Sequence, residues 1–145
     1  MNKGDGLRII GIDFGDKRTG IAVSDESEFL ASPVAVVTEP SLSRLISAVA
    51  GRAKEYDAGM IVVGHPKNMD GSEGEKAQKY AAYAKMLEEE SGVPVKLWDE
   101  RSSTAQAHKY MNETMTKSKK RKSTIDAAAA TVILQSYLDA NQKAR

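Results

Sequence analysis

The sequence contains no cysteine, and this absence excludes disulfide bonds and thiolate metal sites. Any metal must therefore be held by oxygen or histidine ligands. The chain has only two histidines, His65 and His108, and they lie too far apart in the sequence to form a metal-binding motif. A chain without cysteine suits a reducing compartment, and we expect a cytoplasmic protein.

Long apolar runs are also missing. The first six residues are polar and glycine-rich, and no later run of apolar residues is long enough to span a bilayer. We therefore expect a soluble protein without membrane segments. The phosphate-binding motif G-x-x-x-x-G-K-[ST] is absent too, which removes the P-loop nucleotide hydrolases from consideration.

The length of 145 residues fits a single domain, 1–145, whose core is large enough to be stable without covalent cross-links. The formal net charge is only +1, from 21 basic and 20 acidic side chains, but the charges are unevenly distributed. Five cations crowd one short stretch, which we call the basic segment: Lys117, Lys119, Lys120, Arg121 and Lys122. This segment is a candidate contact for an anionic partner.

Five short apolar runs predict β-strands, at residues 9–14, 20–23, 33–37, 60–64 and 95–98. The first three follow one another through short connections, as in an antiparallel meander, and Pro33 marks the third as an edge strand. The fourth and fifth are each reached through a helix, so we expect them to lie parallel to their neighbours. The predicted sheet is mixed, with the strand order 3-2-1-4-5.

Helical spacing of apolar residues predicts four helices, over about 42–56, 73–90, 104–115 and 124–140. Ser41 is a suitable N-cap for the first helix, and Ser72 with Glu75 forms the pattern of a capping box for the second. Together with the strands, these helices predict an α/β fold of three layers, with helices on both faces of the sheet.

Three acidic residues, distant in the sequence, fall at positions where a buried carboxylate needs a partner. Asp13 ends the first strand, Glu100 follows the fifth, and Asp126 lies in the first turn of the last helix. Strands one, four and five point the same way, so their carboxyl ends meet at one edge of the sheet. Because Asp126 continues the apolar stripe of a helix that faces the sheet, we expect all three carboxylates to converge there.

Each of these acids also has a simpler explanation, and Glu100, like its neighbour Asp99, could be an ordinary loop acid. Asp13 could pair with Lys17 or Arg18, which follow it in the turn, and Asp126 could be a capping partner for Ser123. Taken together, however, acids at corresponding ends of separate elements favour a functional site.

The fifth strand ends with two acids, Asp99 and Glu100, whose side chains point to opposite faces, so only one can reach the site. We favour Glu100, because strands one and five are two spacings apart, about 9–10 Å, and its side chain is longer. Carboxylates without histidine or cysteine partners suit hard divalent cations such as Mg²⁺ or Mn²⁺. Two such ions about 3.5–4 Å apart could activate a water molecule and stabilise the leaving oxygen of a phosphodiester.

Four segments carry a resemblance to a known family: GIDFGDKRTGIAVSD (11–25), IVVGHPKNMDGSEG (61–74), WDERSST (98–104) and IDAAAATVIL (125–134). With these segments the chain resembles, almost end to end, the YqgF-type family of Holliday-junction-resolvase-like proteins. Members of this family are also described as pre-16S rRNA nucleases and have a ribonuclease-H-like fold. His65 departs from the family pattern, which is more often apolar there, and Ser102-Ser103 is a mild variant; neither touches the acidic residues.

The resemblance implies metal-dependent cleavage of nucleic-acid phosphodiesters, with Asp13, Glu100 and Asp126 as the catalytic and metal-binding triad. It implies Mg²⁺ or Mn²⁺ as cofactor. The implied substrate is structured RNA, at the 5′ end of pre-16S rRNA, or branched DNA.

Cationic side chains near the acids are candidate contacts for the phosphates of a nucleic acid. They are Lys17, Arg18 and Arg101, together with the basic segment that precedes Asp126. Contacts of this kind give affinity without reading base identity. A solvated basic loop is the simpler alternative for the basic segment.

Three functions from different classes remain open on the sequence. The first is the endonuclease just described; if it resolves DNA junctions, it cuts two strands symmetrically, and a homodimer is expected. The second is a nucleic-acid-binding maturation or transcription factor that keeps the fold without catalysis. The third treats DFGDKRTG as the phosphate-binding turn of an actin-like sugar kinase or ATPase, but such enzymes bind nucleotide between two domains, and this chain has room for one.

Overall fold

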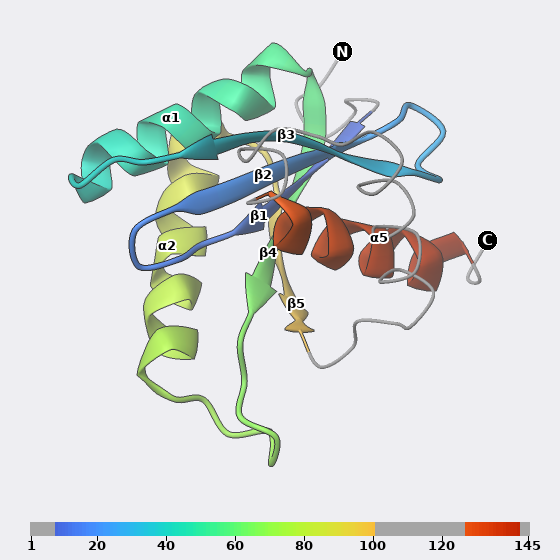
Figure 1. Cartoon of the computed structure of the whole chain (residues 1–145). Coiled ribbons are helices and arrows are strands. Elements are labelled where there is room, and N and C mark those ends of the chain that lie inside the picture. The colour runs from blue at the N-terminus through green and yellow to red at the C-terminus, as the bar shows by residue number, and fades with distance from the viewer. Residues whose placement is uncertain (1–7, 101–126, 143–145) are drawn as a thin grey trace.

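The computed structural model describes residues 8–100 and 127–142, and its centre is a five-stranded sheet (Figure 1). The strands are β1 (Arg8–Asp13), β2 (Thr19–Ser24), β3 (Ala31–Val37), β4 (Ala58–His65) and β5 (Val95–Asp99). Their order is β3-β2-β1-β4-β5. The first three strands pair antiparallel, β4 lies parallel to β1, and β5 lies parallel to β4. The predicted order and directions are confirmed, including the edge position of the strand that contains Pro33.

Helices cover both faces of this sheet (Figure 1). The helices α1 (Leu42–Glu55) and α2 (Glu75–Ser91) lie on one face, and α5 (Ala128–Gln142) lies on the other. The predicted α/β architecture is therefore confirmed. The helix expected over 104–115 and the first residues of the last helix lie outside the described residues. No helix in the described part of the chain is long and apolar enough to cross a membrane.

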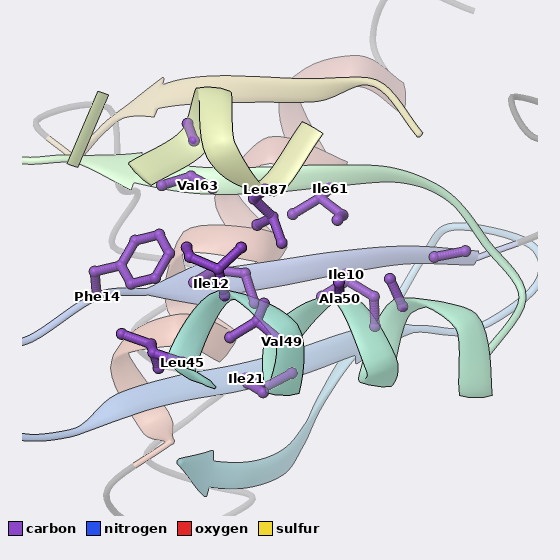
Figure 2. Close-up of a cluster of buried hydrophobic side chains, with 14 of the residues drawn as sticks. Ile10, Ile12, Phe14, Ile21, Leu45, Val49, Ala50, Ile61, Val63 and Leu87 are labelled. Carbon is purple, nitrogen blue, oxygen red and sulfur yellow. The ribbon is translucent and has the colours of Figure 1, made fainter. Parts of the chain in front are cut away.

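Alternation along β1 divides the core into two layers. Ile10, Ile12 and Phe14 pack with residues of α1 and α2, in the cluster that Figure 2 shows. Ile9 belongs to the second cluster, beneath α5, and Gly11 lies against the backbone of that helix. A strand covered on both faces is expected to be apolar throughout, as the sequence of β1 is.

The helix α1 begins directly after Ser41, the residue that the sequence predicts as its N-cap. Ser41 is the N-cap, and its hydroxyl accepts a hydrogen bond from the backbone N–H of Arg44 at 3.5 Å. The helix ends at Glu55, next to the C-cap Tyr56, as expected.

The predicted capping box of α2 is wrong. The N-cap of this helix is Gly74, with no side-chain cap, and the helix begins at Glu75. The Ser72 hydroxyl is used within the preceding loop, where it donates to Asp70 Oδ1 at 2.6 Å and accepts from Asn68 Nδ2 at 2.9 Å. Because these local hydrogen bonds form a turn, the serine does not cap the helix.

Candidate active site

Asp13 is the last residue of β1 and lies on the side of the sheet that α5 covers. The alternation that turns Ile12 and Phe14 toward α1 and α2 turns Asp13 to the opposite side. Burial raises the pKa of the Asp13 carboxyl. A close ion pair with Lys17 or Arg18 would lower this pKa, so the environment of Asp13 is dominated by loss of water and not by a neighbouring cation.

Glu100 follows β5 directly, and its side chain lies on the same side of the sheet. Trp98, two residues earlier, packs on this side, with its ring edge-to-face against Tyr137 of α5 at a centroid distance of 5.3 Å. Alternation then brings Glu100 to the α5 side, while the side chain of Asp99 is directed to the other side. Glu100 is therefore the acid of this pair that shares a face with the carboxylate of β1.

Gly64 of β4 leaves open the space into which the Glu100 carboxylate extends. A Cβ atom on Gly64 would lie 3.0 Å from Glu100 Oε2 and 2.6 Å from Ile133 Cδ1. Gly64 is also the β4 residue beside Asp13, because the strand register pairs the residues that precede them. This glycine is not among the functional residues expected from the sequence. A glycine inside a buried-strand pattern is nevertheless a recognised signal of close approach by another group.

The two carboxylates interact electrostatically. Burial raises the pKa of Glu100, and the negative charges of Asp13 and then Asp99 raise it further. Partly desolvated acids of like charge are stabilised by a cation, and an all-oxygen donor set suits a hard divalent ion. The residues present therefore fit Mg²⁺ or Mn²⁺ better than a softer metal.

The third predicted ligand, Asp126, lies outside the described residues, although the next residue, Ala127, is described and fully buried. Within 8–100 and 127–142, no three acidic or histidine side chains are grouped closely enough to hold a metal ion. The described part of the chain thus supplies two carboxylates to the site. Arg101 and the basic segment also lie outside the described residues, and their roles stay predictions.

The turn between β1 and β2 is tied to the start of α2. Lys76 Nζ lies 3.4 Å from Asp16 Oδ2. Burial raises the pKa of the Tyr80 hydroxyl, and the charge of Asp16 and a hydrogen bond to its carboxylate add to this effect. These contacts hold the turn that exposes Lys17 and Arg18 beside Asp13.

His65, the last residue of β4, is buried on the α2 side. Its Nε2 lies 3.4 Å from Glu73 Oε1, but no hydrogen bond forms there or to any other group in the described part of the chain. The imidazole therefore fills space beneath the β4–α2 loop and does not join the carboxylates, which lie on the opposite side.

The sheet order, the helices on both faces and the acids at the ends of β1 and β5 define an α/β protein with a ribonuclease-H-like fold. The structure is similar to RuvC from T. thermophilus solved in complex with a Holliday junction substrate. The TM-score is 0.68 at 17% identity, over 94% of this chain and 96% of RuvC. It is also similar to the fowlpox virus Holliday junction resolvase, with a TM-score of 0.56 at 15% identity, over 92% and 99% of the two chains.

Sequence comparison then gives the family. The chain belongs to the RuvX family, described as Holliday junction resolvase, whose sequence profile matches residues 7–140. A relative from Clostridium beijerinckii, named "Putative pre-16S rRNA nuclease", is 44% identical over 133 residues, covering 92% of this chain and 96% of the relative. A relative of the same name from Halothermothrix orenii is 39% identical over 137 residues, covering 94% and 98%. The family resemblance expected from the sequence is confirmed.

Proposed function

We propose that this protein is a Mg²⁺- or Mn²⁺-dependent endonuclease that hydrolyses phosphodiester bonds in structured RNA, at the 5′ end of pre-16S rRNA. The observation that carries the proposal is the approach of Glu100, across Gly64 of β4, toward Asp13 on one face of the sheet. The name shared by relatives about 40% identical over most of the chain supports the reaction and the substrate. A substrate of this kind supports the proposal of a cytoplasmic protein.

In this proposal Asp13 and Glu100 hold the cation, and Asp126, one residue before the buried Ala127, completes the ligand set. When bound, a divalent ion of this type supplies Lewis-acid polarisation of the phosphate and activation of a water molecule. The protein contributes two acids on one face of the sheet, both partly removed from water, with the Glu100 carboxylate lying over β4.

The proposed contacts to the nucleic-acid backbone are the exposed Lys17 and Arg18 in the β1–β2 turn, together with Arg101 and the basic segment. Lysine and arginine contacts of this type neutralise phosphates and make the affinity strongly dependent on salt. They recognise RNA and DNA backbones alike, so they do not select the substrate.

Branched DNA is the second candidate substrate. The description of the family profile as a Holliday junction resolvase favours it. Under this alternative two strands must be cut symmetrically, and the protein is expected to act as a two-fold dimer.

A cleavage assay with Asp13→Asn tests the reaction. The substitution keeps the shape of the side chain but removes the charge that holds the cation, and we expect kcat/KM to fall by roughly a thousandfold, equivalent to about 4 kcal/mol. Asp57→Asn is the matched control, because Asp57 is exposed after α1 and has a backbone conformation, φ 53°, that asparagine tolerates. Equal activity of the two variants would remove Asp13 from the mechanism.

The same assay separates the substrates when an rRNA precursor fragment and a four-way DNA junction are compared at equal salt. Faster cleavage of the RNA supports the proposal, and faster cleavage of the junction assigns the second candidate. Normal rRNA maturation in cells that carry only Asp13→Asn would instead indicate a nucleic-acid-binding factor without catalysis.

A further inference from the structure

We infer that Gly64 is a positioning residue for the metal site: because it has no Cβ, the Glu100 carboxylate can extend from β5 across β4 toward Asp13. This inference rests on the proposed function and deepens it, since it names the residue that brings the two acids within reach of one cation.

The strand order makes such a residue necessary. Asp13 ends β1 and Glu100 follows β5, and β4 lies between these two strands. Neighbouring strands are about 4.8 Å apart, so side chains that stand upright on β1 and β5 would be separated by roughly 9–10 Å. A shared ion requires ligand oxygens about 2.0–2.6 Å from the metal, so one carboxylate must lie over the intervening strand.

Gly64 lies at the point where this crossing takes place. It pairs with Trp98 in β5, two residues before Glu100, and stands next to Asp13 in β1. The place that a Cβ would take is 3.0 Å from Oε2 and 3.4 Å from Cδ of Glu100. The carboxylate of Glu100 therefore lies over β4, one strand closer to Asp13 than its own backbone.

An alanine at this position is compatible with the backbone, because among the described glycines only Gly71 and Gly92 have positive φ. The added methyl would instead meet two side chains, Glu100 and Ile133, whose contacting atoms are at their flexible ends. We therefore expect Gly64→Ala to fold, with the Ile133 side chain and the Glu100 carboxylate both displaced.

The double variant Gly64→Ala/Ile133→Val separates the two displacements. Valine lacks the Cδ1 atom that lies 2.6 Å from the new methyl, so the double variant removes the contact with α5 and keeps the contact with Glu100. Ile133→Val alone is the control for the loss of that methyl group.

The experiment titrates Mn²⁺ alone into the metal-free full-length proteins by isothermal calorimetry and measures their thermal unfolding without metal. We expect Gly64→Ala to bind Mn²⁺ about 10–100-fold more weakly, the effect typical of removing support from a metal ligand. In the double variant we expect the unfolding temperature to recover toward that of Ile133→Val, while the Mn²⁺ affinity stays low.

Two results with the variants would overturn the inference. One is wild-type Mn²⁺ affinity in Gly64→Ala. The other is an affinity that recovers together with stability in the double variant, since Gly64 would then act only through the packing of α5. Wild-type protein that binds no Mn²⁺ would overturn both this inference and the proposed cofactor. Wild-type protein that binds Mn²⁺ but cleaves neither substrate would overturn the proposed function alone.

Discussion

The folded protein holds Asp13 and Glu100 at positions where their negative charges lower its stability. Asp13 and Glu100 are both partly removed from water, and the pKa of each is raised by burial. The negative charge of Asp13 further raises the pKa of Glu100. A fold that keeps two acids in this arrangement without a cation loses stability, as is common for residues retained for function. A cation bound by these two acids, as proposed above, should therefore stabilise the protein.

Glu100→Gln is expected to stabilise the metal-free protein at neutral pH, because the charge that burial opposes is removed. Solvent screening of this half-buried carboxyl limits the gain to at most about 1 kcal/mol. The folded-state pKa of Glu100 lies above its unfolded value, so the ionised group destabilises the fold at pH above that folded pKa. This destabilisation shrinks as the pH falls from the folded pKa toward the lower unfolded pKa, and the advantage of Glu100→Gln should shrink in the same range. Urea unfolding in EDTA at several pH values measures both effects.

Glu89→Gln provides the control for the change in net charge, since Glu89 is exposed on α2. We expect its effect to stay within about 0.5 kcal/mol at every pH. A Glu100→Gln protein less stable than wild type in EDTA would show that the carboxylate already has a stabilising partner without metal.

At the level of elements, α5 does more than cover one face of the sheet. Its Gln135 side chain is buried and holds the β2–β3 connection: Oε1 accepts from the backbone N–H of Ala31 at 2.9 Å, and Nε2 donates to the backbone oxygen of Phe29 at 2.8 Å. One side chain thus gives hydrogen-bond partners to two backbone groups of the segment that leads into β3. The packing of Gly11 against Ala130 and Leu134 fixes the same helix over β1.

Gln135→Ala is expected to lower the free energy of unfolding by about 2–4 kcal/mol, because two backbone groups in or near the core lose this partner. Gln78→Ala is the matched control. Its Nε2 also donates to a backbone oxygen, that of Glu73 at 3.0 Å, but at an exposed position, and we expect a change of at most about 0.5 kcal/mol. Denaturant unfolding of the two variants makes the comparison. Equal losses would mean that burial of the Gln135 amide is not what stabilises the connection.

For the molecule as a whole, the parts of the fold that follow from periodicity were predicted from the sequence. The apolar runs and the connections between them predicted the five strands and their order. Alternation along the fifth strand predicted that only one of Asp99 and Glu100 reaches the site, and the longer side chain favoured Glu100. Hydrogen bonds that compete locally were not predicted, because nothing in the spacing of Ser72 and Glu75 shows that Asp70 and Asn68 bind the serine first.

The role of Gly64 was missed for a related reason. A glycine at the end of an apolar run is typical of a strand terminus or a turn. The importance of Gly64 depends on the side chain of Glu100, which lies far along the sequence, after β5. Sequence reasoning could place two acids on one edge of the sheet. It could not show which residue of the strand between them leaves room for their approach.

Metal binding and folding should be linked across the whole molecule, because the proposed ligands lie far apart in the chain and only the folded state could bring them to one ion. An ion present at 100 times its dissociation constant stabilises the fold by about 2.7 kcal/mol, which corresponds to a rise of roughly 5–10 °C in the unfolding temperature. We expect this rise on adding Mg²⁺ or Mn²⁺ to the wild-type protein and not to Asp13→Asn, with sodium chloride at matched ionic strength as the control for screening. Thermal unfolding followed by circular dichroism measures it. The same rise in both proteins would place the stabilising ion elsewhere on the surface, and the two acids would then need another explanation.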